Sequence, residues 1–394
     1  MASFSAPSSS SLFSGPLWRS AFRPFYLLGA GYGVLFMLAW LGVYANLWPA
    51  MASGMPLPSW HGHEIVFGFA GAIITGIVLT ALPTWSGTEE IKDGRLALLA
   101  ALWLAGRIAM WLAPWLPVAA IAAFDCALFP ATALMVAPQL LRAKNKLYLL
   151  LLPVLAGLFA ANLAFHLGSD AFGLRLALYS IMLLYVLKAG VLIPVFTGNA
   201  LREKKRGHEI PPCFVLDALA AGSIAMLAGA DLASLPARWI GLAATAACLV
   251  QALRLARWRG WLVRDEPLVF VMHLGYAWLV VALGLKAAAG LAGAVPQAAW
   301  MHAFTVGALG MMMMGLMTRV VLRHTGRPLG LPPAIVAAYA IMFAAAVLRV
   351  SATLFDLGRM FVAASALLWI VPFLVYLALF GAMLLRPSLP AKGK

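Results

Sequence analysis

The stretch WHGHEIVFGFAGAIITGIVLTAL, residues 60–82, decides the fold. Its last 18 residues carry no charge, and an apolar run of this length can cross the hydrocarbon core of a bilayer as one α-helix. Two histidines and a glutamate stand at the start of this run, namely His61, His63 and Glu64. Because polar side chains at membrane depth are energetically costly, their presence here predicts a functional site.

The composition of the whole chain agrees with a membrane fold. Of its 394 residues, 64% are hydrophobic and 10% are charged, and the mean hydropathy is +0.94. Soluble domains carry roughly 25% charged residues, so we predict an integral membrane protein whose main surroundings are lipid. The net charge of +15 does not indicate nucleic-acid binding, because the basic residues lie in short loops between apolar runs.

Apolar runs of about 20 residues recur along the chain. We predict an all-α membrane bundle, a single domain over residues 21–387 that follows a flexible N-terminal tail (1–20) and precedes a C-terminal tail (388–394). The sequence APWLP at 113–117 leaves two forms open, a tight hairpin or one bent segment. The twelve predicted membrane helices are 25–47, 62–83, 95–113, 117–141, 147–168, 172–197, 212–232, 236–257, 266–291, 297–321, 332–355 and 360–385.

The lysines and arginines alternate between the loops of this arrangement. One set of loops holds 21 of the 28, whereas the alternate loops hold only Arg175, Arg238 and Arg359. Cytoplasmic loops of membrane proteins are enriched in Lys and Arg. The bias therefore predicts that both termini are cytoplasmic. Four further cations fall inside the predicted helices, namely Arg107, Lys188, Lys286 and Arg349.

This topology gives six of the seven histidines a predicted depth within the bundle and puts His208 in a cytoplasmic loop. Four of the six share a layer near the outer face, whereas two lie toward the cytoplasmic side. Imidazole is a common ligand of iron, copper and zinc, so the outer layer predicts a metal site. For each histidine alone, a hydrogen bond across helices is the competing interpretation. The outer four are His61, His63, His166 and His302, and the inner two are His273 and His324.

Two of the predicted helices share a spacing. Both read H-x4-G-x2-G-x4-G, one from His63 and the other from His302. The glycine stripe suits a flat macrocycle or the close approach of a neighbouring helix, and the shared histidine favours a paired ligand site. Buried arginines need an anionic partner, so Arg107 and Arg349 point either to haem propionates or to the local carboxylates. The run of four methionines at 311–314 favours packing over copper ligation, because consecutive side chains point in different directions.

A series of short motifs recurs in order along nearly the whole chain. In this order the motifs resemble the NnrS family of bacterial haem- and copper-containing inner-membrane proteins linked to nitric oxide stress. Val191 stands where the family commonly has arginine, and Arg323 stands where a glycine usually precedes HTGR. The motifs are FRPF (22–25), WHGHEIVFGF (60–69), LTALPTWSG (79–87), LWLAGR (102–107), NLAFH (162–166), IPVFTGN (193–199), EPLVFVMHLGYAWL (266–279), MHAFTVGALG (301–310), MTR (317–319) and HTGRPL (324–329).

The resemblance implies a multi-pass protein of the bacterial inner membrane that binds haem b and copper and meets nitric oxide or iron-nitrosyl species. Whether it turns over nitric oxide or only binds it is left open, and no electron donor is indicated. The family pattern excludes His208 and carries over to His61, His63, Glu64, Arg107, Asn162, His166, His273, His302, Arg319, His324 and Arg327.

From these residues we expect haem b to be held by His63 and His302 near the periplasmic face. His61 and His166 are expected as further ligands or as a copper site, and an inner site at His273 and His324 is a second hypothesis. We expect Arg107 and Arg349 to bind propionates, and Glu64 to orient an imidazole or relay protons. Asn162 and Arg319 complete the expected cofactor-binding set.

Two other functions fit the same sequence. Twelve helices with basic inner loops are common in transporters, and Arg107, Lys188 and Asp125 are candidates to bind a small anion or metal. A factor that delivers haem or copper to another enzyme would use the same histidines. The histidines gather near one face rather than at the midplane, which favours the metalloprotein.

Overall fold

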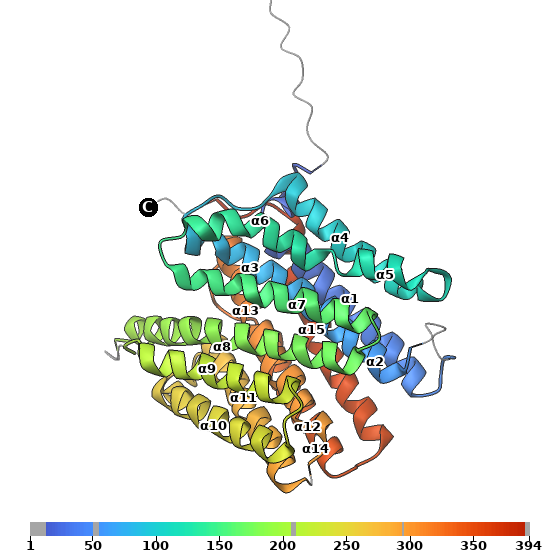
Figure 1. Cartoon of the computed structure of the whole chain (residues 1–394). Helices are drawn as coiled ribbons and strands as arrows, with labels where there is room; N and C mark the ends of the chain where they lie inside the picture. The colour runs from blue at the N-terminus through green and yellow to red at the C-terminus, as the bar shows by residue number, and fades with distance from the viewer. Residues whose placement is uncertain (1–12, 50–54, 206–209, 294, 391–394) are drawn as a thin grey trace, which may run out of the picture.

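Twelve apolar helical spans build a single bundle in the computed structural model (Figure 1). The structure describes residues 13–49, 55–205, 210–293 and 295–390, and these residues contain no strand. The predicted membrane fold with twelve helices is therefore confirmed. His208 and the outer parts of both predicted tails lie outside the described residues.

The helices follow the predicted order. The first six spans comprise α1 (Phe22–Tyr44), α2 (Leu57–His63) continued by the π-helical segment η2 (Glu64–Ala70) and α3 (Gly71–Ser86), α4 (Asp93–Trp111), α5 (Val118–Asp125) with α6 (Leu128–Arg142), α7 (Leu151–His166) and α8 (Asp170–Glu203). The last six comprise α9 (Phe214–Leu232), α10 (Ala237–Arg257), α11 (Pro267–Ala292), α12 (Gln297–His302) continued by the π-helical segment η6 (Ala303–Leu309) and α13 (Gly310–His324), α14 (Pro333–Leu354) and α15 (Arg359–Leu385).

The sequence APWLP forms the tight hairpin rather than one bent segment. Helix α4 ends at Trp111, one turn of 3-10 helix covers Ala113–Trp115, and α5 runs back along α4. The contact is close at Gly106, where an added Cβ would lie 2.9 Å from the Cα of Asp125. This return places the carboxylate of Asp125 beside α4.

Both ends of the helical chain meet at one end of the bundle. Arg23, which the sequence placed in a loop, lies inside α1 and is only 3% exposed. Its guanidinium donates hydrogen bonds to the carbonyl oxygens of Leu384 (2.9 Å) and Arg386 (2.6 Å) at the end of α15. A cation is stabilised there because unpaired carbonyls and the negative end of the helix dipole face it.

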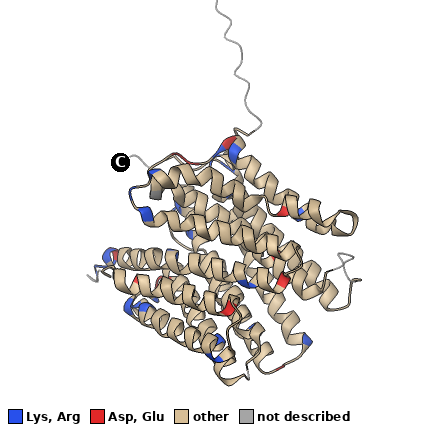
Figure 2. Cartoon of the chain, viewed as in Figure 1, with Lys and Arg blue, Asp and Glu red and all other residues tan. Residues whose placement is uncertain are grey.

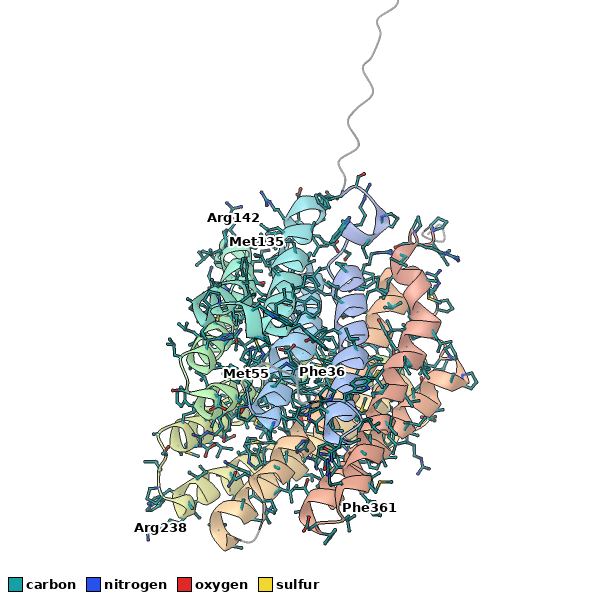
Figure 3. All side chains as sticks on the ribbon, turned by 90° about the vertical axis from the view of Figure 1, so that its right-hand side faces the viewer. Phe36, Met55, Met135, Arg142, Arg238 and Phe361 are labelled. Atoms are coloured by element: carbon teal, nitrogen blue, oxygen red, sulfur yellow. The ribbon has the colours of Figure 1, made fainter. Side chains whose placement is uncertain are left out.

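We call this the basic end of the bundle, because the Lys- and Arg-rich loops lie there (Figure 2). Figure 3 shows the two ends side-on, with Arg142 near the basic end and Arg238 and Phe361 near the opposite end. The opposite end carries the starts of α2 and α12 and the end of α7. Four of the described histidines therefore lie near one end, as the count of helices predicted.

Two spans form the centre of the bundle. In Leu57–Thr84 and Gln297–His324, 83% and 78% of the most apolar window is buried, against 33–61% in the other spans. These are the two helices that share the histidine and glycine spacing. Helix α8 ends at Glu203, six residues beyond the predicted end at 197. Hydropathy missed these last turns because they are polar.

Candidate metal centre and histidine cavity

The two central spans are built alike. Each begins as α-helix, changes to seven residues of π-helix immediately after His63 or His302, and returns to α-helix at Gly71 or Gly310. Single π-helical turns inside α-helices are frequently found at functional sites. In η2 the carbonyl oxygen of Gly68 accepts a hydrogen bond from the indole of Trp103 (2.9 Å).

The shared glycines serve close packing in this structure. A Cβ at Gly76 would lie 2.9 Å from Phe25, one at Gly310 would lie 2.8 Å from the sulfur of Met342, and one at Gly315 would lie 2.7 Å from Val271. Neighbouring side chains therefore fill the stripe, and it offers no surface to a macrocycle.

Gly68 lies against the charged groups of the site, and its replacement gives a direct test. A Cβ there would lie 2.6 Å from Tyr32 and 3.2 Å from both Arg107 and Glu64. We expect Gly68→Ala to lower the free energy of unfolding by about 1–3 kcal/mol, as overpacking does. Gly71→Ala is the matched control, because its nearest neighbour is at 3.4 Å. Equal stability of the two variants in denaturant titrations would contradict this interpretation.

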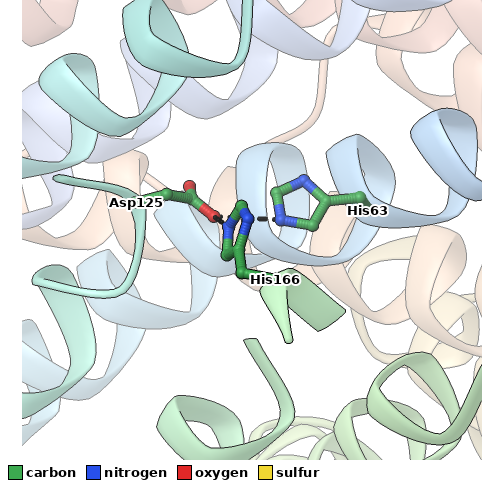
Figure 4. A group of neighbouring side chains, drawn as sticks. All are labelled: His63, Asp125 and His166. Atoms are coloured by element: carbon green, nitrogen blue, oxygen red, sulfur yellow. Dashed lines mark hydrogen bonds and ion pairs between the residues drawn. The ribbon is translucent and has the colours of Figure 1, made fainter. Parts of the chain in front are cut away.

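Three side chains converge at the first part of the site (Figure 4). The Nε2 atom of His63 lies 3.0 Å from Oδ2 of Asp125, and Nε2 of His166 lies 2.8 Å from the same oxygen. All three side chains are at most 5% exposed. Their donor atoms lie within 4.8 Å of one another, and among the described residues this is the one group of three or more His, Cys, Asp or Glu side chains so placed. We call it the His63 cluster.

A network of charged groups holds the His63 cluster in place. Nδ1 of His63 lies 2.8 Å from Glu64, and the guanidinium of Arg107 donates to both oxygens of Glu64 at 2.7 Å and to Oδ1 of Asp125. The hydroxyl of Tyr32 donates to Glu64. Two carboxylates therefore face one guanidinium, so the network has room for one more positive charge without a net excess.

Asn162 completes the surroundings of His63. Its amide nitrogen donates to the backbone oxygen of Asp125 (3.2 Å), which turns its Oδ1 toward Nε2 of His63 at 2.9 Å. Both nitrogens of His63 thus face oxygen atoms. Glu64, Arg107 and Asn162, expected to contact a cofactor, here contact side chains or backbone of the His63 cluster and one another.

The second part of the site is a cavity of about 440 Å³, which we call the histidine cavity. His61 and His302 line it from the two central spans, and Arg349 lines it from α14. Its aromatic walls come from Trp40, Tyr44 and Trp369. His63 is not among the lining residues, so the structure places His61, rather than His63, in one cavity with His302.

The donor groups of the histidine cavity fit a haem. Nδ1 of His302 lies 2.7 Å from the carbonyl oxygen of Ala298, which leaves Nε2 for a metal, as in most histidine ligands. Nδ1 of His61 is buried without a hydrogen-bond partner. Arg349 has no ion pair among the described residues and donates only to Thr353 (2.5 Å). Cofactor cavities are about 300–1,000 Å³ and mostly apolar, and this cavity falls within that range.

The remaining predicted residues lie elsewhere. His273 bonds Thr197 (2.9 Å) and packs against Trp258, whereas His324 packs against Phe22. The two inner histidines therefore have different neighbours. The guanidinium of Arg319 lies 3.8 Å above the ring of Phe196. All four methionines at 311–314 are buried in the core, in line with packing.

Two residues of the site have a weaker signal in the sequence. The sequence offers Asp125 as a partner for a buried arginine or as part of an anion site, and it gives no functional signal for Tyr32. The signal for Asp125 was present, because it is one of few acids within an apolar run. Its neighbours depended on the hairpin at 113–117, which the sequence left open.

Comparison with known proteins agrees with the motif order. No curated protein matches the chain. The model of one family, described as NnrS protein, matches residues 16–388, nearly the whole chain. The chain belongs to the NnrS family.

Proposed function

We propose that this protein binds haem b in the histidine cavity and acts in the response to nitric oxide at the bacterial inner membrane, with the basic end in the cytoplasm. One observation supports the proposal most. Imidazoles from two central helices line one apolar cavity together with Arg349, which has no ion pair among the described residues. A membrane-buried cation needs an anion, and a propionate of haem supplies one.

The residues of the cavity would have distinct roles. His302, oriented by the carbonyl of Ala298, and His61 are the residues that would hold the haem iron, and Arg349 would bind a propionate. This proposal replaces His63 by His61 in the expected ligand pair. A haem iron held there would supply a binding site for nitric oxide, which would take the place of one of the two imidazoles. Trp40 and Trp369 limit the access of water, while a small apolar gas can enter from the lipid.

A visible spectrum of the purified protein tests the proposal. After expression with sufficient iron and extraction into mild detergent, we expect one haem b per chain, an intense Soret band, and a shift of that band when nitric oxide is added to the reduced protein. A colourless protein that contains no haem would refute the proposal.

The transport alternative finds less support in the geometry. Two of the groups considered for anion binding, Arg107 and Asp125, are ion-paired with each other and with neighbours of the network. An anion would have to displace a carboxylate from the guanidinium. Coupled solute flux in vesicles made from haem-free protein would favour transport instead.

A further inference from the structure

The His63 cluster is separate from the histidine cavity and has the donor set of a metal site. It offers two imidazole nitrogens and one carboxylate oxygen, all buried and all within 4.8 Å of one another. Two imidazoles and one carboxylate are the set that proteins use for non-haem ferrous iron. We propose that His63, His166 and Asp125 bind one divalent transition-metal ion, with ferrous iron as the expected occupant.

The spacing of the donor atoms suits a metal ion. Donors at about 2.1 Å from an ion, on adjacent corners of an octahedron, are about 3 Å apart. The two nitrogens lie 3.0 and 2.8 Å from Oδ2 of Asp125. Oδ1 of Asn162 lies 2.9 Å from Nε2 of His63 and is within reach as a fourth donor.

The surrounding residues orient these donors in the way that ligands of metal sites are oriented. Glu64 holds Nδ1 of His63 at 2.8 Å, which directs Nε2 toward the cluster. Arg107 binds Oδ1 of Asp125 and leaves Oδ2 to the histidines. Glu64 and Arg107 are therefore positioning residues rather than ligands.

Charge also favours a cation at this place. The carboxylates of Glu64 and Asp125 face one guanidinium, that of Arg107, in a region from which water is excluded. These groups leave one negative charge, which a proton on His63 or a bound cation would compensate. A divalent ion would bring the net charge to +1, so the donor atoms rather than the charge select the valence of the ion.

The donor set distinguishes between metal ions. Cuprous ion prefers the sulfur of cysteine or methionine, whereas imidazole and carboxylate suit divalent ions. Among the described residues no cysteine belongs to the group, although Cys126 follows Asp125 in the chain. His166 is the last residue of α7, so the group lies near the end of the bundle opposite the termini.

The test counts iron that is not haem iron. Full-length protein in detergent is loaded with Fe²⁺ without oxygen, and total iron and haem are measured separately. We expect one iron per chain beyond the haem, with the Mössbauer signature of high-spin iron in nitrogen and oxygen coordination. In Asp125→Asn we expect the affinity for this iron to fall at least about tenfold while haem content stays unchanged.

The control is Asp231→Asn, which replaces another buried acid. The carboxylate of Asp231 accepts hydrogen bonds from Lys286 (3.0 Å) and Tyr179 (2.7 Å), and neither belongs to the His63 cluster or its network. This variant should keep the additional iron. His166→Gln should lose it and leaves the ion pair of Arg107 intact, so it decides the matter if Asp125→Asn does not fold. Cu⁺ is added in a parallel titration, and Asp125→Asn should leave its binding unchanged.

Three results would overturn this inference. The protein could hold no iron beyond that of haem, or the additional iron could persist in both Asp125→Asn and His166→Gln. In the third, Asp125→Asn would abolish the binding of Cu⁺ and leave the binding of iron unchanged. The inference stands apart from the haem proposal. Additional iron in a protein without haem would refute the haem proposal alone, and haem without additional iron would refute this inference alone.

Discussion

Replacing His302 with alanine is expected to remove most of the bound haem. Its Nδ1 is held by the carbonyl of Ala298, so its Nε2 is the better oriented of the two candidate ligands in the histidine cavity. Loss of that ligand should weaken haem affinity at least about tenfold, since even changes behind a ligand cost 10–100-fold. The Soret absorbance per chain measures the loss. Free imidazole should restore part of it, because the alanine leaves space for the missing ring.

The matched control is His324→Ala, at the other end of the same span and packed against Phe22. It should keep its haem. His61→Ala should resemble His302→Ala, whereas His63→Ala should retain haem because His63 lies outside the cavity. If His302→Ala and His61→Ala both keep an unaltered spectrum, the haem lies elsewhere.

Replacing Arg107 with methionine is expected to be among the most destabilising changes in the chain. Arg107 is 4% exposed, and among the described residues it is the one arginine or lysine that pairs with Glu64 and Asp125. Removing one partner of a buried ion pair costs about 3–5 kcal/mol, because the remaining charge is left unpaired. Denaturant titration of the detergent-solubilised protein measures the loss.

A triple variant separates charge from packing. Arg107→Met combined with Glu64→Gln and Asp125→Asn leaves no unpaired charge and should recover part of the stability. Arg95→Met, which removes an exposed cation from the same helix α4, should stay within about 0.5 kcal/mol of the unchanged protein. A triple variant less stable than Arg107→Met alone would show that the charges do not govern stability here.

The sequence was sufficient to predict the fold. The length of each apolar run predicts one membrane helix, because the thickness of the bilayer sets how many residues must be helical. The alternation of Lys and Arg between successive loops predicts which helices run in the same direction. Errors fell at helix ends. Arg23 is buried in α1 because the carbonyls of α15 satisfy it, and a contact between the two ends of the chain cannot be read from local hydropathy.

The sequence predicted how far along each helix the histidines lie, but not toward which neighbouring helix their side chains point. Hydropathy placed His61, His63, His166 and His302 near one end, and the structure agrees. Hydropathy does not reveal toward which neighbour a side chain points on a central helix that is surrounded by other helices. Residues two apart on a helix differ by about 200°, so His61 and His63 face different neighbours. For that reason the sequence paired His63 with His302, whereas in the structure His61 lines the same cavity as His302.

Gly62 separates His61 and His63, one of which lines the histidine cavity and the other the His63 cluster. A Cβ on Gly62 would lie 2.8 Å from Leu174 of α8, so the helix is seated tightly on its neighbour at that point. Turning this short segment to favour one ring must displace the other. Binding at one site would then change the affinity of the other through the peptide backbone. Because such coupling is reciprocal, each occupant would change the affinity of the other site by the same factor.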